Sequence, residues 1–146
     1  MNLSEHFTLD ELCASATADK FGIDNTPNPT IIGNLQVTAE GLEKVRALLG
    51  YPLHVNSGYR CLQLNSAVDG AAHSAHMDGF AADFVSSRFG TPVDIAKAIA
   101  GSTIPFDKCI QEGNWVHISF APTMRRLTYT AHFDGSAPTY TRGICS

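Results

Sequence analysis

The spacing of apolar residues indicates helices in the first two thirds of the chain. Between Pro29 and Leu49, apolar side chains recur at roughly helical spacing, and Gly50 stands where a glycine commonly ends a helix. Gly33 and Gly41 lie inside this segment and leave open whether it forms one helix or two. Shorter helices are predicted over residues 8–13, 61–68 and 91–100.

Shorter apolar runs predict strands at residues 53–56, 80–85, 108–112, 115–120 and 127–133. The dipeptide at 113–114, Gly-Asn, has the length and composition of a tight hairpin turn. In that hairpin Glu112 pairs with Trp115 and Ile110 pairs with His117, so all four side chains share one face of the sheet. Helices followed by antiparallel strands predict an α+β fold, in which an antiparallel sheet is flanked by N-terminal and mid-chain helices.

The length and composition are those of one compact globular domain. The chain has 146 residues, of which 44% are hydrophobic and 16% charged, so we expect a single domain over residues 1–146. The net charge of −4 argues against a nucleic-acid partner, because such proteins usually present a basic face. No apolar run approaches the ~20 residues of a membrane span, and the first residues lack the features of a secretory signal. These observations predict a protein made in a cytoplasm, without a membrane span.

The cysteines stand singly along the chain, at positions 13, 61, 109 and 145. None belongs to a C-x-x-C pair, which excludes a zinc ribbon or a thioredoxin-like motif. We therefore expect reduced and mostly buried thiols, with Cys145 free at the surface.

The densest group of metal-capable side chains lies between His73 and Asp83, and His117 offers a further imidazole. His76, Asp83 and His117 together supply two imidazoles and a carboxylate, which suits a catalytic zinc site with one open position. The apolar residues around Asp83 favour this interpretation, since an unpaired buried carboxylate is costly. A capped or salt-bridged aspartate and a surface histidine would give the same pattern.

The predicted hairpin places Glu112 diagonally across from His117. A carboxylate beside a zinc site is typical of a general base that activates water. An ordinary solvent-facing glutamate at a hairpin end is the alternative. Asn114 has no basic group, so the choice of Glu112 depends on the hairpin register.

Three motifs, taken in order, resemble those of the zinc D-alanyl-D-alanine carboxypeptidases and related phage peptidoglycan endopeptidases, the M15-type metallopeptidases. They are Ser57-Gly58-Tyr59-Arg60 with Asn65, then Ser74-x-His76-x-x-Gly79-x-Ala81-Ala82-Asp83, and Trp115-Val116-His117-Ile118-Ser119. Weaker matches near the N-terminus and at Arg125-Arg126 extend the resemblance over nearly the whole chain. The resemblance implies the fold shared by these peptidases and the Hedgehog signalling domain.

The resemblance also assigns roles to individual positions. His76, Asp83 and His117 match the ligands of one zinc ion. Arg60 matches an arginine that contacts the substrate, where a planar, permanently charged group can polarise the scissile carbonyl or hold a carboxylate. Ser74 matches a small polar residue that orients the first ligand or binds substrate.

The catalytic acid is the point at which relatives differ. Many place it three residues before the last zinc histidine, where this chain has Asn114, whereas others place a glutamate five residues before, as Glu112 is here. We expect Glu112 to be catalytic, with Asp78 as the alternative. Tyr59 and Trp115 are candidate substrate-binding residues, although Tyr59 could instead brace Arg60 and Trp115 could serve packing.

His73 stands three residues before His76 and could be a partner of that ligand, whereas the other remaining histidines have no ligand spacing. His73 is expected on a loop, and His6, His54 and His132 are expected to be surface or core residues.

These residues lead us to expect a zinc peptidase that hydrolyses a peptide bond in bacterial peptidoglycan stem peptides or cross-links, acting as a monomer. The absence of a signal peptide favours a phage-type endolysin that waits in the host cytoplasm and reaches the cell wall after the membrane is permeabilised. Carboxypeptidase and endopeptidase activities both remain open. The alternative is a catalytically inactive module of the same fold that binds peptidoglycan or peptide.

Overall fold

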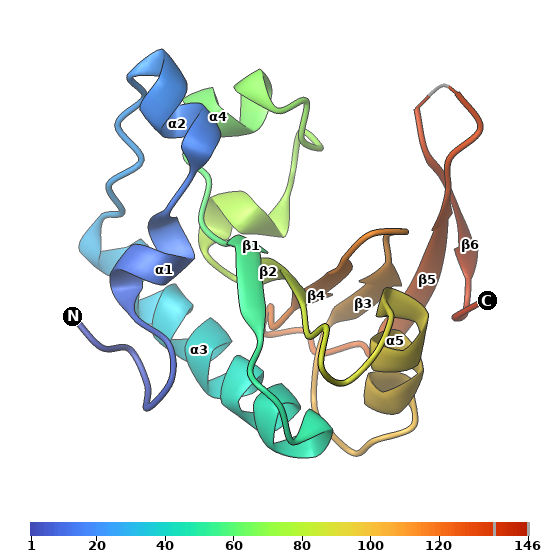
Figure 1. Ribbon diagram of the computed structural model, residues 1–146. Helices are drawn as coiled ribbons and strands as arrows, with labels where there is room; N and C mark the ends of the chain where they lie inside the picture. Colours follow the sequence, from blue (N-terminus) through green and yellow to red (C-terminus); the bar gives the residue numbers. More distant parts are fainter. Residues whose placement is uncertain (136, 146) are drawn as a thin grey trace.

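The computed structural model describes residues 1–135 and 137–145, and Figure 1 shows how their helices and strands are arranged. The helices are α1 (Leu9–Cys13), α2 (Ala16–Phe21), α3 (Pro29–Leu49), α4 (Leu62–Ala67), the 3-10 helix η1 (Ala75–Asp78) and α5 (Pro92–Ala100). The strands are β1 (His54–Ser57), β2 (Ala81–Val85), β3 (Lys108–Gln111), β4 (Val116–Ser119), β5 (Leu127–His132) and β6 (Thr139–Arg142). They form a six-stranded sheet in the order β1-β2-β4-β3-β5-β6. The α+β class predicted from the sequence is confirmed.

The long helix α3 runs without a break from Pro29 to Leu49, so the two-helix alternative is wrong. Asn28 caps its start by accepting a hydrogen bond from the Ile31 backbone N–H at 2.9 Å. Gly41 weakens the helical propensity but permits close packing, because a Cβ atom there would lie 2.4 Å from the Phe120 ring. Tertiary contact with Phe120 therefore accounts for the glycine within the helix.

The sheet is mixed, which differs from the antiparallel sheet expected. Strands β3 and β5 pair in parallel, whereas the other pairings are antiparallel. After β4 the chain passes the first residue of β3 and then forms β5, on the side of β3 opposite β4. Asp107 anchors this crossing, since its carboxylate accepts hydrogen bonds from Arg125 Nε and Nη2, each at 2.8 Å. Alternation of apolar residues does not encode which strands are neighbours, so the sequence pattern missed this pairing.

Three elements of the structure were not predicted from the sequence. Helix α2 buries only Ala18, and all of β6 is exposed, so neither has an apolar periodicity. The 3-10 helix η1 covers a stretch for which no helix or strand was predicted.

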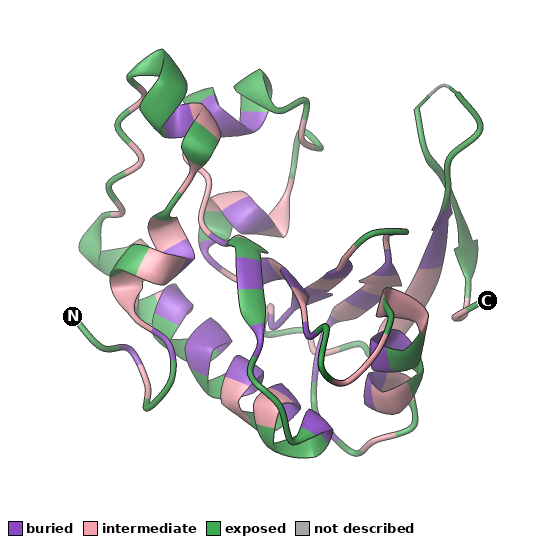
Figure 2. Cartoon of the chain, in the orientation of Figure 1, coloured by how far each residue is buried: buried purple, intermediate pink, exposed green. Residues whose placement is uncertain are grey.

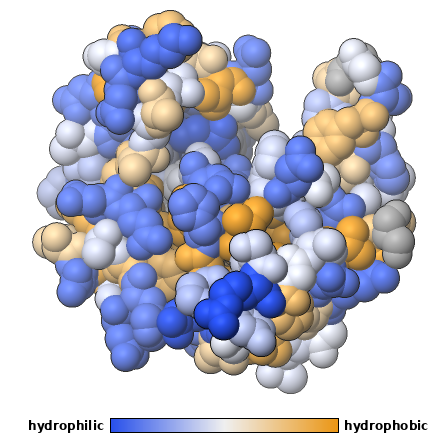
Figure 3. All heavy atoms as spheres, in the orientation of Figure 1, coloured by the Kyte–Doolittle hydropathy of each residue, from blue (hydrophilic) through white to orange (hydrophobic). Residues whose placement is uncertain are grey.

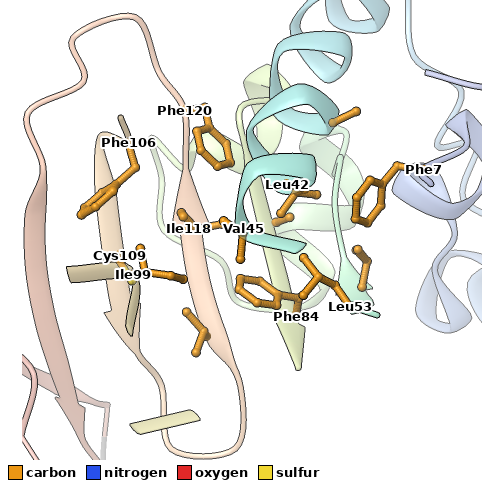
Figure 4. Packing of buried hydrophobic residues seen from close by; sticks show 14 of the residues in the cluster. Phe7, Leu42, Val45, Leu53, Phe84, Ile99, Phe106, Cys109, Ile118 and Phe120 are labelled. Carbon is orange, nitrogen blue, oxygen red and sulfur yellow. The ribbon is translucent and has the colours of Figure 1, made fainter. Parts of the chain in front are cut away.

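The two faces of the sheet have different roles. One face packs against α3 and α5, where Leu42 and Val45 of α3 meet Phe84 of β2, and Ile99 of α5 meets Cys109 of β3 (Figure 4). The other face carries polar side chains. Figure 2 shows the buried residues concentrated in the central strands and the inner sides of the helices. Among the described residues, no helix has the length and apolar character needed to cross a membrane.

Candidate active site

Three metal-capable side chains from separate elements meet on the polar face of the sheet. His76 lies on η1, Asp83 on β2 and His117 on β4, where Asp83 and His117 are directly paired across the strands. Asp83 Oδ1 lies 3.0 Å from His117 Nδ1 and 3.3 Å from His76 Nε2. One ligand-capable atom from each residue lies within 4.8 Å of the others. The structure therefore brings together the ligand set expected from the sequence.

The hydrogen bonding of His76 determines which ring nitrogen it can offer. Its Nδ1 atom lies 2.7 Å from the Gly58 carbonyl oxygen, so Nδ1 carries the proton and donates. Its Nε2 atom is buried and has no hydrogen-bond partner among the described residues. An unprotonated, buried imidazole nitrogen aimed at a carboxylate is the donor that a divalent metal requires. Two imidazoles and one carboxylate fit zinc with an open position.

Helix α3 and Ser74 hold η1 in place. Asn34 donates to the Asp78 carbonyl at 2.8 Å, and Thr38, one turn further along α3, donates to the Gly79 carbonyl at 2.6 Å. The Ser74 hydroxyl accepts a hydrogen bond from the His76 backbone N–H at 3.2 Å and caps η1. This contact favours the orienting role for Ser74 over direct substrate binding.

The electrostatic surroundings favour a neutral His76 imidazole beside an ionised Asp83 carboxylate. Burial lowers the pKa of His76, which favours the neutral imidazole despite the nearby Asp83 carboxylate. Burial by itself would raise the pKa of Asp83, but the adjacent His76 and the hydrogen bond from His117 outweigh it and hold that pKa below its usual range. A neutral imidazole beside a carboxylate is the protonation state in which both can bind a metal.

Glu112 lies at the end of the hairpin beside this cluster. The predicted register is confirmed: Ile110 pairs with His117, and the Glu112 backbone N–H donates to the Trp115 carbonyl at 3.0 Å. Gly113 takes a positive φ of 82°, as a tight turn requires. Glu112 is half-buried, and burial raises its pKa, an effect that the nearby His117 partly offsets.

Arg60 approaches the same cluster from the segment after β1. Its backbone N–H donates to the His76 carbonyl at 3.1 Å, and its buried Nε atom has no hydrogen-bond partner among the described residues. Burial lowers its pKa, whereas the Asp83 and Glu112 carboxylates oppose that shift. A guanidinium with an unused buried donor beside the metal-capable side chains can bind a carbonyl or carboxylate of a ligand.

Asn25 is a positioning residue that the sequence analysis did not identify. Its Nδ2 atom donates to the carbonyls of Cys13, at 3.0 Å, and Tyr59, at 2.9 Å, and its Oδ1 atom accepts from the Cys61 N–H at 2.8 Å. The two residues that flank Arg60 are thereby clamped by one side chain. The Asp24-Asn25-x-Pro27 pattern was visible, but nothing in it indicated a partner 34 residues away.

The two other predicted site residues, Trp115 and Tyr59, have different surroundings. Trp115 shares the sheet face of Glu112 and His117, as expected from the hairpin register. Burial raises the pKa of the Tyr59 hydroxyl, whose neighbouring ionisable groups are Cys61, Cys13 and Asp24 rather than the metal-capable residues.

Asp78 and the remaining histidines are not part of the metal-capable group formed by His76, Asp83 and His117. Asp78 is exposed, and its carbonyl, not its carboxylate, holds the contact with Asn34. His73, His6, His54 and His132 are all exposed. The cysteines are free, with Cys109 buried and Cys145 exposed.

Residues 5–119 match the model of a protein family described as Peptidase M15. The match covers every residue of the cluster and ends at the last residue of β4. No curated protein matches the chain.

Proposed function

The chain belongs to the peptidase M15 family, and we propose that residues 1–146 form a single zinc peptidase domain that hydrolyses a peptide bond in bacterial peptidoglycan. The observation that carries this proposal is the convergence of His76, Asp83 and His117, with their ligand-capable atoms within 4.8 Å. The buried, unpartnered Nε2 of His76 is unfavourable without a partner, and a bound cation relieves that cost. A zinc ion held there supplies the Lewis acidity that acidifies water and polarises a carbonyl.

Glu112 is the proposed general base. Its raised pKa brings the carboxylate closer to the range in which it can both accept and release a proton near neutral pH. In the forward reaction Glu112 takes a proton from the attacking water and delivers it to the amine of the departing peptide. Asp78 is a weaker candidate for this role because its side chain is exposed.

Arg60 is proposed to bind the substrate. Its guanidinium lies close enough to Asp83 and Glu112 for both charges to act on its pKa, and its Nε donor is free of other described contacts. From that position Arg60 can stabilise negative charge that develops on the scissile carbonyl oxygen, or hold a substrate carboxylate. Ser74 orients His76, and Trp115 offers an aromatic face beside Glu112.

The fold, the oligomeric state and the biological role are inferred from the resemblance of the sequence motifs to those of the M15-type metallopeptidases. We propose the shared fold of the zinc D-alanyl-D-alanine carboxypeptidases and the Hedgehog domain, a monomer, and a phage-type endolysin that acts on the wall after the host membrane is permeabilised. The substrate is a stem peptide or cross-link.

The test is mass spectrometry of bacterial sacculi after incubation with the purified, zinc-loaded protein, with and without a chelator. New peptide ends that disappear with chelator and return with zinc would establish the activity and identify the cleaved bond. Intact sacculi in the presence of folded, zinc-loaded protein would contradict the peptidase proposal. Sacculi that bind this protein without being cut would instead identify a peptidoglycan-binding module.

A further inference from the structure

The hairpin formed by β5 and β6 continues the face of the sheet that carries the candidate active site. Directly paired positions place one row of residues on that face: Asp83, His117, Ile110, Tyr129 and Arg142. The hairpin follows the segment that matches the family model, which ends at residue 119. Figure 3 shows the tip of the hairpin standing apart from the rest of the molecule across a notch in the surface.

A second row on the same face begins at Glu112. Because Gln111 pairs with Thr130, Glu112 stands opposite Ala131, which in turn pairs with Tyr140. Ala131 is small and only 6% exposed, so Tyr140 can lean across it toward the candidate base. The Glu112 and Asp83 carboxylates both act on the Tyr140 hydroxyl, whose pKa is raised by burial first and then by these charges. This coupling agrees with the position given by the strand register.

Arg142 stands at the far end of the first row. Its guanidinium carbon lies 5.5 Å from the centre of the Tyr129 ring, a stacking contact that supports the long side chain against the sheet. Among the described residues, no carboxylate lies within ion-pair distance of Arg142. Its positive charge is therefore available to an anionic ligand lying along the sheet.

We propose that the β5–β6 hairpin forms the outer part of the substrate-binding surface, in which Arg142 binds a carboxylate of an extended peptide and Tyr140 packs against the segment leading to the scissile bond. This inference rests on the proposed function and adds a substrate requirement to it. A peptide too short to reach Arg142 gains nothing from the hairpin.

The strand spacing sets the length of substrate that the surface accepts. Three strand-to-strand steps separate His117 from Arg142, which amounts to about 14 Å at the usual spacing of strands. An extended peptide covers that distance with about four residues. Stem peptides have about this length and carry carboxylates, so they satisfy both requirements.

The experiment measures binding on the Glu112→Gln background, where turnover does not interfere. The probe is the pentapeptide L-Ala-D-Glu-L-Lys-D-Ala-D-Ala, together with one form amidated at the D-Glu carboxylate and another amidated at the C-terminus. Isothermal titration calorimetry gives each affinity for zinc-loaded protein with and without the further substitution Arg142→Gln, which keeps most of the side-chain stem. We expect Arg142→Gln to weaken binding of the free pentapeptide about fivefold to tenfold. It should have no further effect on the amidated form that lacks the carboxylate bound by Arg142.

Matched controls separate recognition from folding. Arg88→Gln removes a guanidinium whose carbon lies 5.2 Å from the Tyr51 ring, the same kind of stacking contact in another part of the protein. It should leave every affinity unchanged. Arg142→Lys keeps the charge and should recover part of the affinity. In otherwise wild-type protein, Tyr140→Ala, which removes the packing ring, should raise KM for the pentapeptide, whereas Tyr51→Ala should not.

The outcomes separate the proposed role of the hairpin from the proposed peptidase activity. The proposed role of the hairpin would be overturned if Arg142→Gln left the affinity for the free pentapeptide unchanged, or if it lowered the affinity for all three peptide forms by the same factor. Cleavage of sacculi by the wild-type protein combined with that result would leave the peptidase proposal standing. If Arg142→Gln is unfolded by circular dichroism, the Tyr140→Ala comparison decides: an unchanged KM for the pentapeptide would overturn the proposal.

Discussion

The Nδ1 atom of His76 lies 2.7 Å from the carbonyl oxygen of Gly58, and this contact ties the first candidate metal ligand to the segment that carries Arg60. A second contact joins the same two segments, because the Arg60 backbone N–H donates a hydrogen bond to the His76 carbonyl at 3.1 Å. The proposed metal-binding residue His76 and the proposed substrate-binding residue Arg60 are thus joined through one short stretch of backbone. A disturbance at Gly58 should affect both.

We expect Gly58→Ala to lower metal affinity, activity and stability together. An added Cβ atom would lie 2.2 Å from the Leu12 carbonyl oxygen, so the backbone must shift. Such overpacking costs about 1–3 kcal/mol of unfolding free energy. The matched control is Gly33→Ala on an exposed part of α3, where nothing lies within 4 Å of the new atom. That change should stabilise the protein by about 0.5–1 kcal/mol. Urea denaturation and zinc content by mass spectrometry measure both variants, and equal behaviour would contradict the prediction.

Glu112→Gln should abolish catalysis without removing the metal. The amide has nearly the same shape as the carboxylate but cannot accept the proton of water, so kcat should fall by about 10²- to 10⁴-fold. His76→Ala should lose both zinc and activity. Asp78→Asn, which changes an exposed carboxylate, should keep both. Near-normal turnover by Glu112→Gln would exclude Glu112 as the base.

The pH dependence of kcat/KM should report the surroundings of Glu112. Burial raises its pKa, and catalysis needs the deprotonated form, so activity should fall as the pH drops through that raised value. The positive charge of Arg60 lowers the pKa of Glu112. Arg60→Gln should therefore move the acid limb to higher pH, in addition to lowering kcat/KM, whereas Arg60→Lys should keep the limb near its original position. An acid limb that does not move in Arg60→Gln would argue that the two residues are not coupled.

Asp107 should stabilise the fold in a pH-dependent way. Its hydrogen bonds from Arg125, with smaller contributions from Thr123, hold its pKa well below the usual range despite its burial. A depressed pKa in the folded state means that the stabilisation is complete above the unfolded pKa, near 4, and is lost as the pH falls further. Asp107→Asn should lower the unfolding free energy by about 1–3 kcal/mol at pH 7.

The difference between Asp107→Asn and wild type should shrink as the pH falls from about 4 to about 2, because the Asp107 carboxyl of the unfolded wild-type chain is then increasingly protonated while the folded one stays ionised. Urea denaturation at several pH values measures it. Glu5→Gln, at a side chain that is 84% exposed, serves as the control and should change little. A difference that stays constant down to pH 2 would argue against the ionised pair.

The sequence by itself determined the features that depend on residues close together in the chain. The capping box at Thr8 and Glu11, the Asn28 cap and the turn at Gly113 each depend on neighbours a few residues apart, and the turn formed as expected. The hairpin register followed from the same local logic and placed Glu112 on the face of His117. The motifs around His76, Asp83 and His117 were also visible in the chain, and the family match agrees with the resemblance they carry.

Tertiary structure decided what depends on distant contacts. The parallel pairing of β3 with β5 rests on the Asp107–Arg125 crossing, and β6 is an exposed strand that carries no apolar pattern. The clamp of Asn25 on the residues around Arg60 joins segments 34 residues apart. Apolar periodicity records which face of an element is buried, but not which elements become neighbours. The row that joins His117 to Arg142 could therefore be recognised only once the strand order was known.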